Sequence, residues 1–143
     1  MDSASSAVGQ VESTEELRVH RVDTVSKLQD LMPFVSHNQE LLKYVVATWR
    51  DPDTLILRYG RSCAIVSILD HPFMGKIAIF AWGQNPDRFN TKAGLNLVER
   101  WSKDRGATKL ISFVDENGPW NRIPAFTRLT GMTPYRMVFA KEL

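Results

Sequence analysis

The spacing of apolar residues along this chain changes several times, and each change marks the start of another expected element. Apolar runs and alternating patterns predict β-strands over residues 17–22, 54–59, 62–69, 76–82, 109–114 and 134–140. Apolar positions three or four residues apart predict helices after a cap at Asp23 or Thr24, after Asn38, over residues 91–105 and between Asn121 and Gly131. The expected order is β-α-α-β-β-β-α-β-α-β, which is typical of an α/β domain with a single mixed sheet and helices on both faces.

The connections in the middle of the chain predict how its strands pair. The Gly60-Arg61 turn and the turn over residues 70–75 are too short for a crossover. The strands that they join should therefore form an antiparallel meander.

The next connection is longer and contains the helix over residues 91–105, so the strands on either side of it should be parallel, with a right-handed crossover. The polar loop over residues 83–90 then lies at the N-terminal end of that helix, where free amides and the helix dipole favour an anion. A phosphorylated cofactor, if one binds, is expected at this loop.

Composition narrows the class of protein. Residues 1–16 carry few apolar side chains, so a flexible N-terminal tail is expected ahead of a single domain over residues 17–143. The 18 basic and 16 acidic side chains give a net charge of +2, so no nucleic-acid partner is expected. No apolar run approaches the roughly 18 residues of a membrane span, and residues 1–16 lack the basic and apolar regions of a signal peptide, so none is expected. We therefore expect a cytoplasmic protein without a membrane partner.

The cysteine and histidine residues predict neither a disulfide nor a metal site. Cys63 lies in an apolar strand and is the only cysteine, so a buried thiol and no disulfide are expected. The three histidines lack metal-ligand spacing, so no metal site is expected.

Two segments resemble parts of the GNAT acetyltransferase superfamily. The helix that contains Leu95-Asn96-Leu97-Val98 and ends at Gly106 is similar to the family's Leu-rich helix, and the ending from Asn121 through Gly131-Met132 is similar to its Asn-rich closing helix. The order of elements from about Leu17 to Leu143 matches as well. The resemblance implies two parallel strands that part, with acyl-CoA between them and its pyrophosphate on the following loop. The cofactor contacts that it implies are Trp82, Arg88, Asn90, Thr91 and Lys92.

The chain departs from the family's pattern at positions that matter for catalysis. Phe89 and Thr91 stand where the family has loop glycines, so the cofactor loop is degenerate. Thr127 stands where many members have a tyrosine that acts as general acid, and residues 76–82 contain no carboxylate to act as general base. Together these departures argue against efficient acyl transfer.

Other side chains are candidates for the missing roles. Asp115 and Glu116 follow the second parallel strand and would form either a proton-accepting pair or a solvated loop. Tyr135 would be either a replacement acid or an ordinary tyrosine of the final strand. Trp82 would either stack on a ligand or pack in the core or against a partner.

Two hypotheses follow. The first is a non-catalytic GNAT-like binding or structural module without a cofactor, loosely similar to GNAT-like internal virion proteins of short-tailed phages. It would have protein partners in a larger assembly, in the cytoplasm or in a virion, and it predicts that Phe89 and its neighbours fill the cofactor gap. The alternative is an acetyl-CoA-dependent N-acetyltransferase that acts on an amine.

Overall fold

The structure of this chain is a computed structural model that describes residues 19–113, 123–133 and 141–143. It divides into two compact units, Met1–Ser112 and Phe113–Leu143, which are considered separately below. The predicted tail over residues 1–16, the loop with Asp115 and Glu116, and the final strand with Tyr135 lie outside the described residues. The division into a tail and one domain over residues 17–143 stays a prediction.

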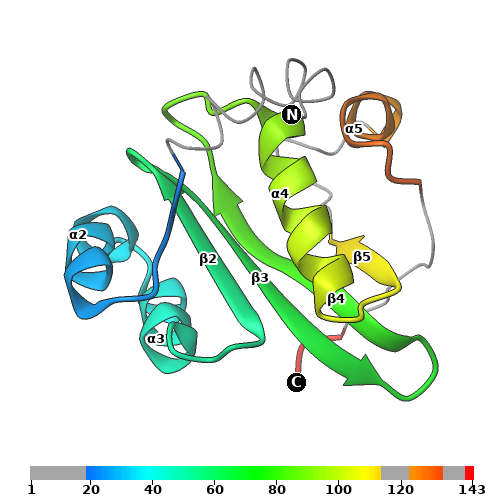
Figure 1. Cartoon of the computed structure of the whole chain (residues 1–143), viewed down its shortest axis with the longest axis horizontal. Coiled ribbons are helices and arrows are strands. Elements are labelled where there is room, and N and C mark those ends of the chain that lie inside the picture. Colours follow the sequence, from blue (N-terminus) through cyan, green and yellow to red (C-terminus); the bar gives the residue numbers. More distant parts are fainter. Residues whose placement is uncertain (1–18, 114–122, 134–140) are drawn as a thin grey trace, which may run out of the picture. The chain divides into compact units, whose positions relative to one another are not determined.

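The first unit contains a five-stranded mixed sheet with the strand order β1-β2-β3-β4-β5 (Figure 1). Its strands are β1 (His20–Arg21), β2 (Thr54–Tyr59), β3 (Ser62–His71), β4 (Gly75–Gln84) and β5 (Lys109–Ser112). Neighbours from β1 to β4 run antiparallel, and β4 and β5 run parallel. The predicted meander and the predicted parallel pair are both confirmed.

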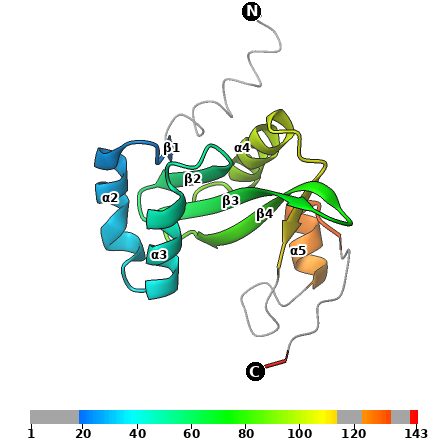
Figure 2. The same cartoon turned by 90° about the horizontal axis from the view of Figure 1, so that it is seen from below.

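Helices cover both faces of this sheet, as predicted. Figure 2 shows α4 (Thr91–Asp104) on the side opposite α2 (Val25–Val35) and α3 (Gln39–Thr48). Each helix begins at a polar cap, because a side-chain oxygen there satisfies an amide of the first turn. The caps are Thr24, whose hydroxyl accepts from the Lys27 amide at 3.2 Å, Asn38, which accepts from Leu41 at 3.1 Å, and Asn90, which accepts from Ala93 at 3.0 Å.

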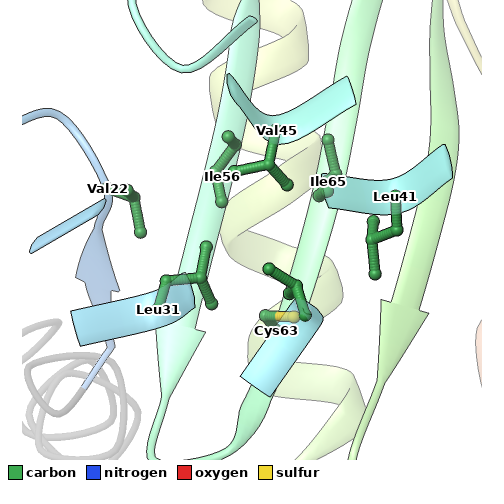
Figure 3. Packing of buried hydrophobic residues seen from close by; sticks show 8 residues of the cluster. Val22, Leu31, Leu41, Val45, Ile56, Cys63 and Ile65 are labelled. Atoms are coloured by element: carbon green, nitrogen blue, oxygen red, sulfur yellow. The ribbon is translucent and has the colours of Figure 1, made fainter. Parts of the chain in front are cut away.

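Apolar side chains of the sheet form two clusters, because successive residues of a strand point to opposite faces. In β2, Ile56 belongs to the α2–α3 cluster, between the sheet and those two helices, while Leu55 belongs to the α4 cluster on the other face. Figure 3 shows the α2–α3 cluster, whose buried members are Val22, Leu31, Val35, Leu41, Val45, Ile56, Cys63 and Ile65. The buried members of the α4 cluster are Leu55, Val66, Ala78 and Val98.

The β3–β4 hairpin is longer than the pattern predicts. The strands extend to His71 and from Gly75, so only residues 72–74 form the turn instead of residues 70–75. The His71 Nδ1 atom accepts hydrogen bonds from the amides of Phe73 at 3.1 Å and Met74 at 3.2 Å. These hydrogen bonds stabilise the short turn. The alternation of apolar residues in the sequence does not reveal them, so the pattern predicts a longer turn.

In the second unit, α5 (Ile123–Thr130) is the predicted short helix, and its predicted stop is confirmed. Gly131 has φ +74°, a left-handed conformation that glycine adopts without steric cost. The Gly131 amide donates to the Thr127 carbonyl at 2.8 Å and so closes the last turn.

Cys63 is buried, as predicted, and its surroundings disfavour the thiolate. The side chain is 6% exposed within the α2–α3 cluster. Burial raises the pKa of the thiol from 9.0 to about 11, although the positive charge of Arg58 acts in the opposite direction. The thiol is therefore a packing group with little nucleophilic character.

A thiol reagent tests this environment, because Cys63 is the only cysteine in the sequence. At pH 8 the raised pKa makes the thiolate about 100-fold scarcer than in an unfolded chain, so native protein should react at least about 100-fold more slowly than protein in urea. The measurement is the rate of disulfide exchange with a chromogenic aromatic disulfide. Rapid stoichiometric labelling of the native protein would contradict the buried position.

Candidate functional site

β4 contains a β-bulge at Ala81. Ile65 of β3 lies opposite Trp82, but the next residue, Val66, lies opposite Phe80. Ala81 is therefore an extra residue without a cross-strand partner in β3. A bulge of this kind bends the strand and increases its twist.

The bulge reverses which face each later residue of β4 points to. Before it, Ala78 and Phe80 pack in the α4 cluster. After it, Trp82 packs, partly buried, in the α2–α3 cluster, although unbroken alternation would place it on the same face as Phe80. Gly83 returns to the face of Phe80, where a Cβ atom would lie 2.7 Å from the Phe80 ring.

The pairing of β4 with β5 stops at the same place. Registered pairs run from Ile77 opposite Lys109 to Phe80 opposite Ser112, and β4 continues to Gln84. Within the described residues, the stretch from Ala81 to Gln84 has no strand neighbour on this edge. We call this point the β4–β5 fork. The resemblance to the GNAT superfamily implies two parallel strands that part here, and residues 114–122, which follow β5, lie outside the described residues.

The loop after β4, residues 85–90, is held in shape by its own side chains. The Asn85 Oδ1 atom accepts from the Phe89 amide at 2.7 Å and from the Ser62 hydroxyl at 2.8 Å. The Asp87 amide donates to the same Ser62 hydroxyl at 3.1 Å, and the Arg88 amide to the Asn85 carbonyl at 3.2 Å. These three loop amides therefore already have acceptors within the protein.

An ion pair fixes the loop to the β2–β3 turn. The Asp87 carboxylate accepts from the Arg61 guanidinium, with the Nη2 atom at 2.6 Å, and from the Arg61 amide at 2.6 Å. The hydrogen bond from the Arg61 side chain is the largest cause that lowers the pKa of Asp87. Gly60 turns the chain at φ +60°, and a Cβ atom there would collide with the Asp87 carboxylate.

Phe89 does not lie where the module hypothesis places it. Its ring lies 5.0 Å from the Tyr59 ring, centroid to centroid, and close to Gly94 of α4. Tyr59 belongs to β2, two strands from β4 on the side away from β5. The ring therefore packs away from the fork, and the prediction that Phe89 fills the cofactor gap is wrong.

The predicted cofactor contacts gather at the start of α4, with one exception. Arg88, Thr91 and Lys92 are exposed around the Asn90 cap, and the amides of Thr91 and Lys92 have no acceptor among the described residues. These groups are positioned to meet an anion. Trp82 instead packs in the α2–α3 cluster, so the core interpretation of this residue is the one that the structure supports.

The described part of the structure places none of the predicted catalytic candidates at the β4–β5 fork. Asp115, Glu116 and Tyr135 lie outside the described residues. Thr127 is half-buried on α5, in the second unit.

Sequence reasoning missed Gln84. Its side-chain amide donates to the Arg61 carbonyl at 2.8 Å and to the Phe34 carbonyl of α2 at 3.3 Å. Gln84 thus joins the end of α2 to the end of β4. No local pattern reveals this, because its acceptors are backbone carbonyls far away in the sequence.

Other features of the described residues lie elsewhere. A shallow recess of about 520 Å³ is lined by His20, Arg58, Tyr59, Gly60 and Asp87, on the β1–β2 side of the sheet. The described residues contain no group of side chains able to hold a metal ion. Among them, no helix is long and apolar enough to cross a membrane.

Solved structures share this fold. An aminoglycoside antibiotic 6'-N-acetyltransferase from Acinetobacter haemolyticus superposes with a TM-score of 0.59 at 17% identity, covering 87% of this chain and 98% of that one. A ribosomal-protein-alanine N-acetyltransferase from Brucella melitensis has the same TM-score at 11% identity and covers 87% of this chain and 99% of that one. No protein-family model matches the sequence, and neither does any curated protein. At such low identity the likeness establishes the fold, which is that of the GNAT acetyltransferases.

The backbone of the loop offers a test of its shape. Arg88 has φ +54°, a left-handed conformation that costs a residue with a Cβ atom about 1 kcal/mol. The Arg88→Gly variant should therefore be about 1 kcal/mol more stable than Arg88→Ala. Both variants lack the guanidinium group, so urea denaturation of the pair isolates the backbone term. An alanine variant as stable as the glycine variant would show that the left-handed turn is absent.

Proposed function

We propose that this chain, which has the fold of the GNAT acetyltransferases, binds acetyl-CoA at the β4–β5 fork and transfers the acetyl group to an amine. The observation that carries the proposal is the end of β4–β5 pairing at the Ala81 bulge. Among the described residues, the edge of β4 from Ala81 to Gln84 then has no strand neighbour on the β5 side, next to the loop that leads into α4. A linear ligand with its own amides can pair with such an edge in the way an added strand does.

The residues around the fork fit a thioester cofactor of this kind. The amides of the pantetheine arm would pair with backbone groups of the β4 edge from Ala81 to Gln84. Lys92 and Arg88 carry positive charge at the head of α4, and the amides of Thr91 and Lys92 point from its first turn. These groups would hold the pyrophosphate without the glycines that the loop lacks, because the side chains supply charge where backbone approach is restricted.

When bound, acetyl-CoA would supply an activated acyl group, and the protein would contribute mainly by positioning the amine and the thioester relative to each other. The described strands β4 and β5 contain no carboxylate that could act as a base. Holding the amine and the thioester carbon in contact would account for much of the acceleration, since well-oriented pairs react with effective molarities of about 10⁵ M or more.

A non-catalytic binding module is the second candidate, and one observation favours it. The amides of Asp87, Arg88 and Phe89 already have acceptors within the chain, so the loop offers a pyrophosphate few backbone donors. In this case the fork would hold a cofactor or an extended segment of a protein partner, as part of a larger assembly, without a reaction.

Acetyl-CoA binding is the direct test of the proposed site. Isothermal titration should give a micromolar dissociation constant, and Lys92→Ala should weaken it about tenfold, because one charge-assisted contact to phosphate is lost. Lys103→Ala is the matched control: this lysine is exposed in the last turn of the same helix, and its loss should leave binding unchanged. Absence of binding at millimolar acetyl-CoA would overturn the proposal.

Transfer distinguishes the two candidate functions once binding is established. The structural neighbours suggest two acceptors, a peptide with an N-terminal alanine and an aminoglycoside. Release of the CoA thiol with either acceptor, above the rate without it, would support the enzyme. Binding of acetyl-CoA without amine-dependent thiol release for both would favour the binding module.

A further inference from the structure

We infer that His37 accepts the proton of the amine substrate at the fork. The inference rests on the proposed function and adds to it the proton acceptor that the described parts of β4 and β5 lack. His37 has no counterpart among the residues that the resemblance to the GNAT superfamily implies, and only the tertiary structure brings it near β4.

His37 sits at a fixed point of the chain, between two helices. Ser36 is the C-cap of α2 and Asn38 is the N-cap of α3, so His37 is the one residue between the caps. The Ser36 amide donates to the Met32 carbonyl at 3.0 Å, and the Asn38 amide donates to the Val35 carbonyl at 3.2 Å. A residue held on both sides in this way presents its side chain from a defined position.

The α2–α3 turn lies against the part of β4 beyond the bulge. The His37 ring lies 6.5 Å from the Trp82 ring, centroid to centroid, at an interplanar angle of 48°. Trp82 points to this face only because Ala81 shifts the alternation of β4. The Gln84 side chain adds a second link, since it donates to the Phe34 carbonyl near the end of α2. The imidazole is therefore beside the stretch of β4 that has no neighbour on the β5 side among the described residues.

Of the three histidines in the sequence, His37 alone combines this position with an available ring. Its side chain is exposed and makes no hydrogen bond or ion pair within the described residues. The Nδ1 atom of His71 already accepts from two amides at the far end of the β3–β4 hairpin. His20 lies on β1, three strands from β4. Imidazole is the side chain that most often acts as a general base in enzymes.

The step that we assign to His37 balances as follows. A protonated amine gives one proton to the imidazole, which makes the nitrogen lone pair available. The nitrogen then forms a bond to the acetyl carbon as the carbon–sulfur bond breaks, and the thiolate leaves with that bonding pair. The second proton lost from nitrogen neutralises the thiolate, and exposed His37 passes the first proton to solvent. The products are the acetylamide, the CoA thiol and one proton.

His37→Gln tests the assignment, because glutamine keeps a polar side chain but cannot accept a proton at neutral pH. The turnover number, measured as CoA thiol release with the acceptor that the wild type uses, should fall about 10²–10⁴-fold. The dissociation constant for acetyl-CoA from isothermal titration should stay unchanged, and added imidazole should restore part of the turnover. His20→Gln is the matched control, since it removes an exposed histidine away from the fork and should leave turnover unchanged.

The outcomes separate the two proposals. A wild type that transfers acetyl groups, with an equally active His37→Gln variant, would overturn the role of His37 and leave the proposed function standing. A loss of turnover that accompanies weaker acetyl-CoA binding and resists imidazole would also overturn it, because that pattern indicates structural damage. A wild type that binds no acetyl-CoA would overturn the proposed function, and the role of His37 with it.

Discussion

The extra residue in β4 is the constraint on which the rest of the site depends. A strand paired on both sides must keep its two-residue alternation in step with both neighbours. Ala81 breaks that step against β3, and the registered β4–β5 pairs of the described residues end at Phe80 and Ser112, just before it. The same residue therefore turns Trp82 toward α2 and α3, next to the stretch of β4 that has no strand neighbour on the β5 side among the described residues. The extra residue accounts for the packing of Trp82, and it lies where the described β4–β5 pairing ends.

The end of β4 also joins two parts of the chain that are remote in sequence. Gln84 bonds to backbone carbonyls of α2 and of the β2–β3 turn, and Asp87 is paired with Arg61 in that turn. The loop before α4 is consequently ordered by side chains, where the family's pattern uses glycines. The replacement of loop glycines by other residues leaves the GNAT fold unchanged. The sheet and its two apolar clusters do not depend on the loop residues that would contact an anion.

The candidate site was only partly predictable. The position of Arg88, Thr91 and Lys92 at the start of α4 follows from the order strand, loop and helix, since a parallel crossover places them there. The direction of the Phe89 ring was not predictable, because its partner Tyr59 lies thirty residues earlier and only the sheet brings the two together. The same holds for His37 beside Trp82.

By itself, the sequence determined the types and order of the elements that the structure describes, because apolar spacing and polar caps such as Thr24, Asn38 and Asn90 act within one or two turns of chain. It also determined the antiparallel and parallel pairings, through the lengths of the connections. Only the tertiary structure decided the bulge at Ala81, the end of β4–β5 pairing and the side chains gathered there. The physical reason is that a strand's register is set jointly by its two neighbouring strands and by the helices on both faces of the sheet. A local sequence pattern does not contain the combined effect of these long-range contacts.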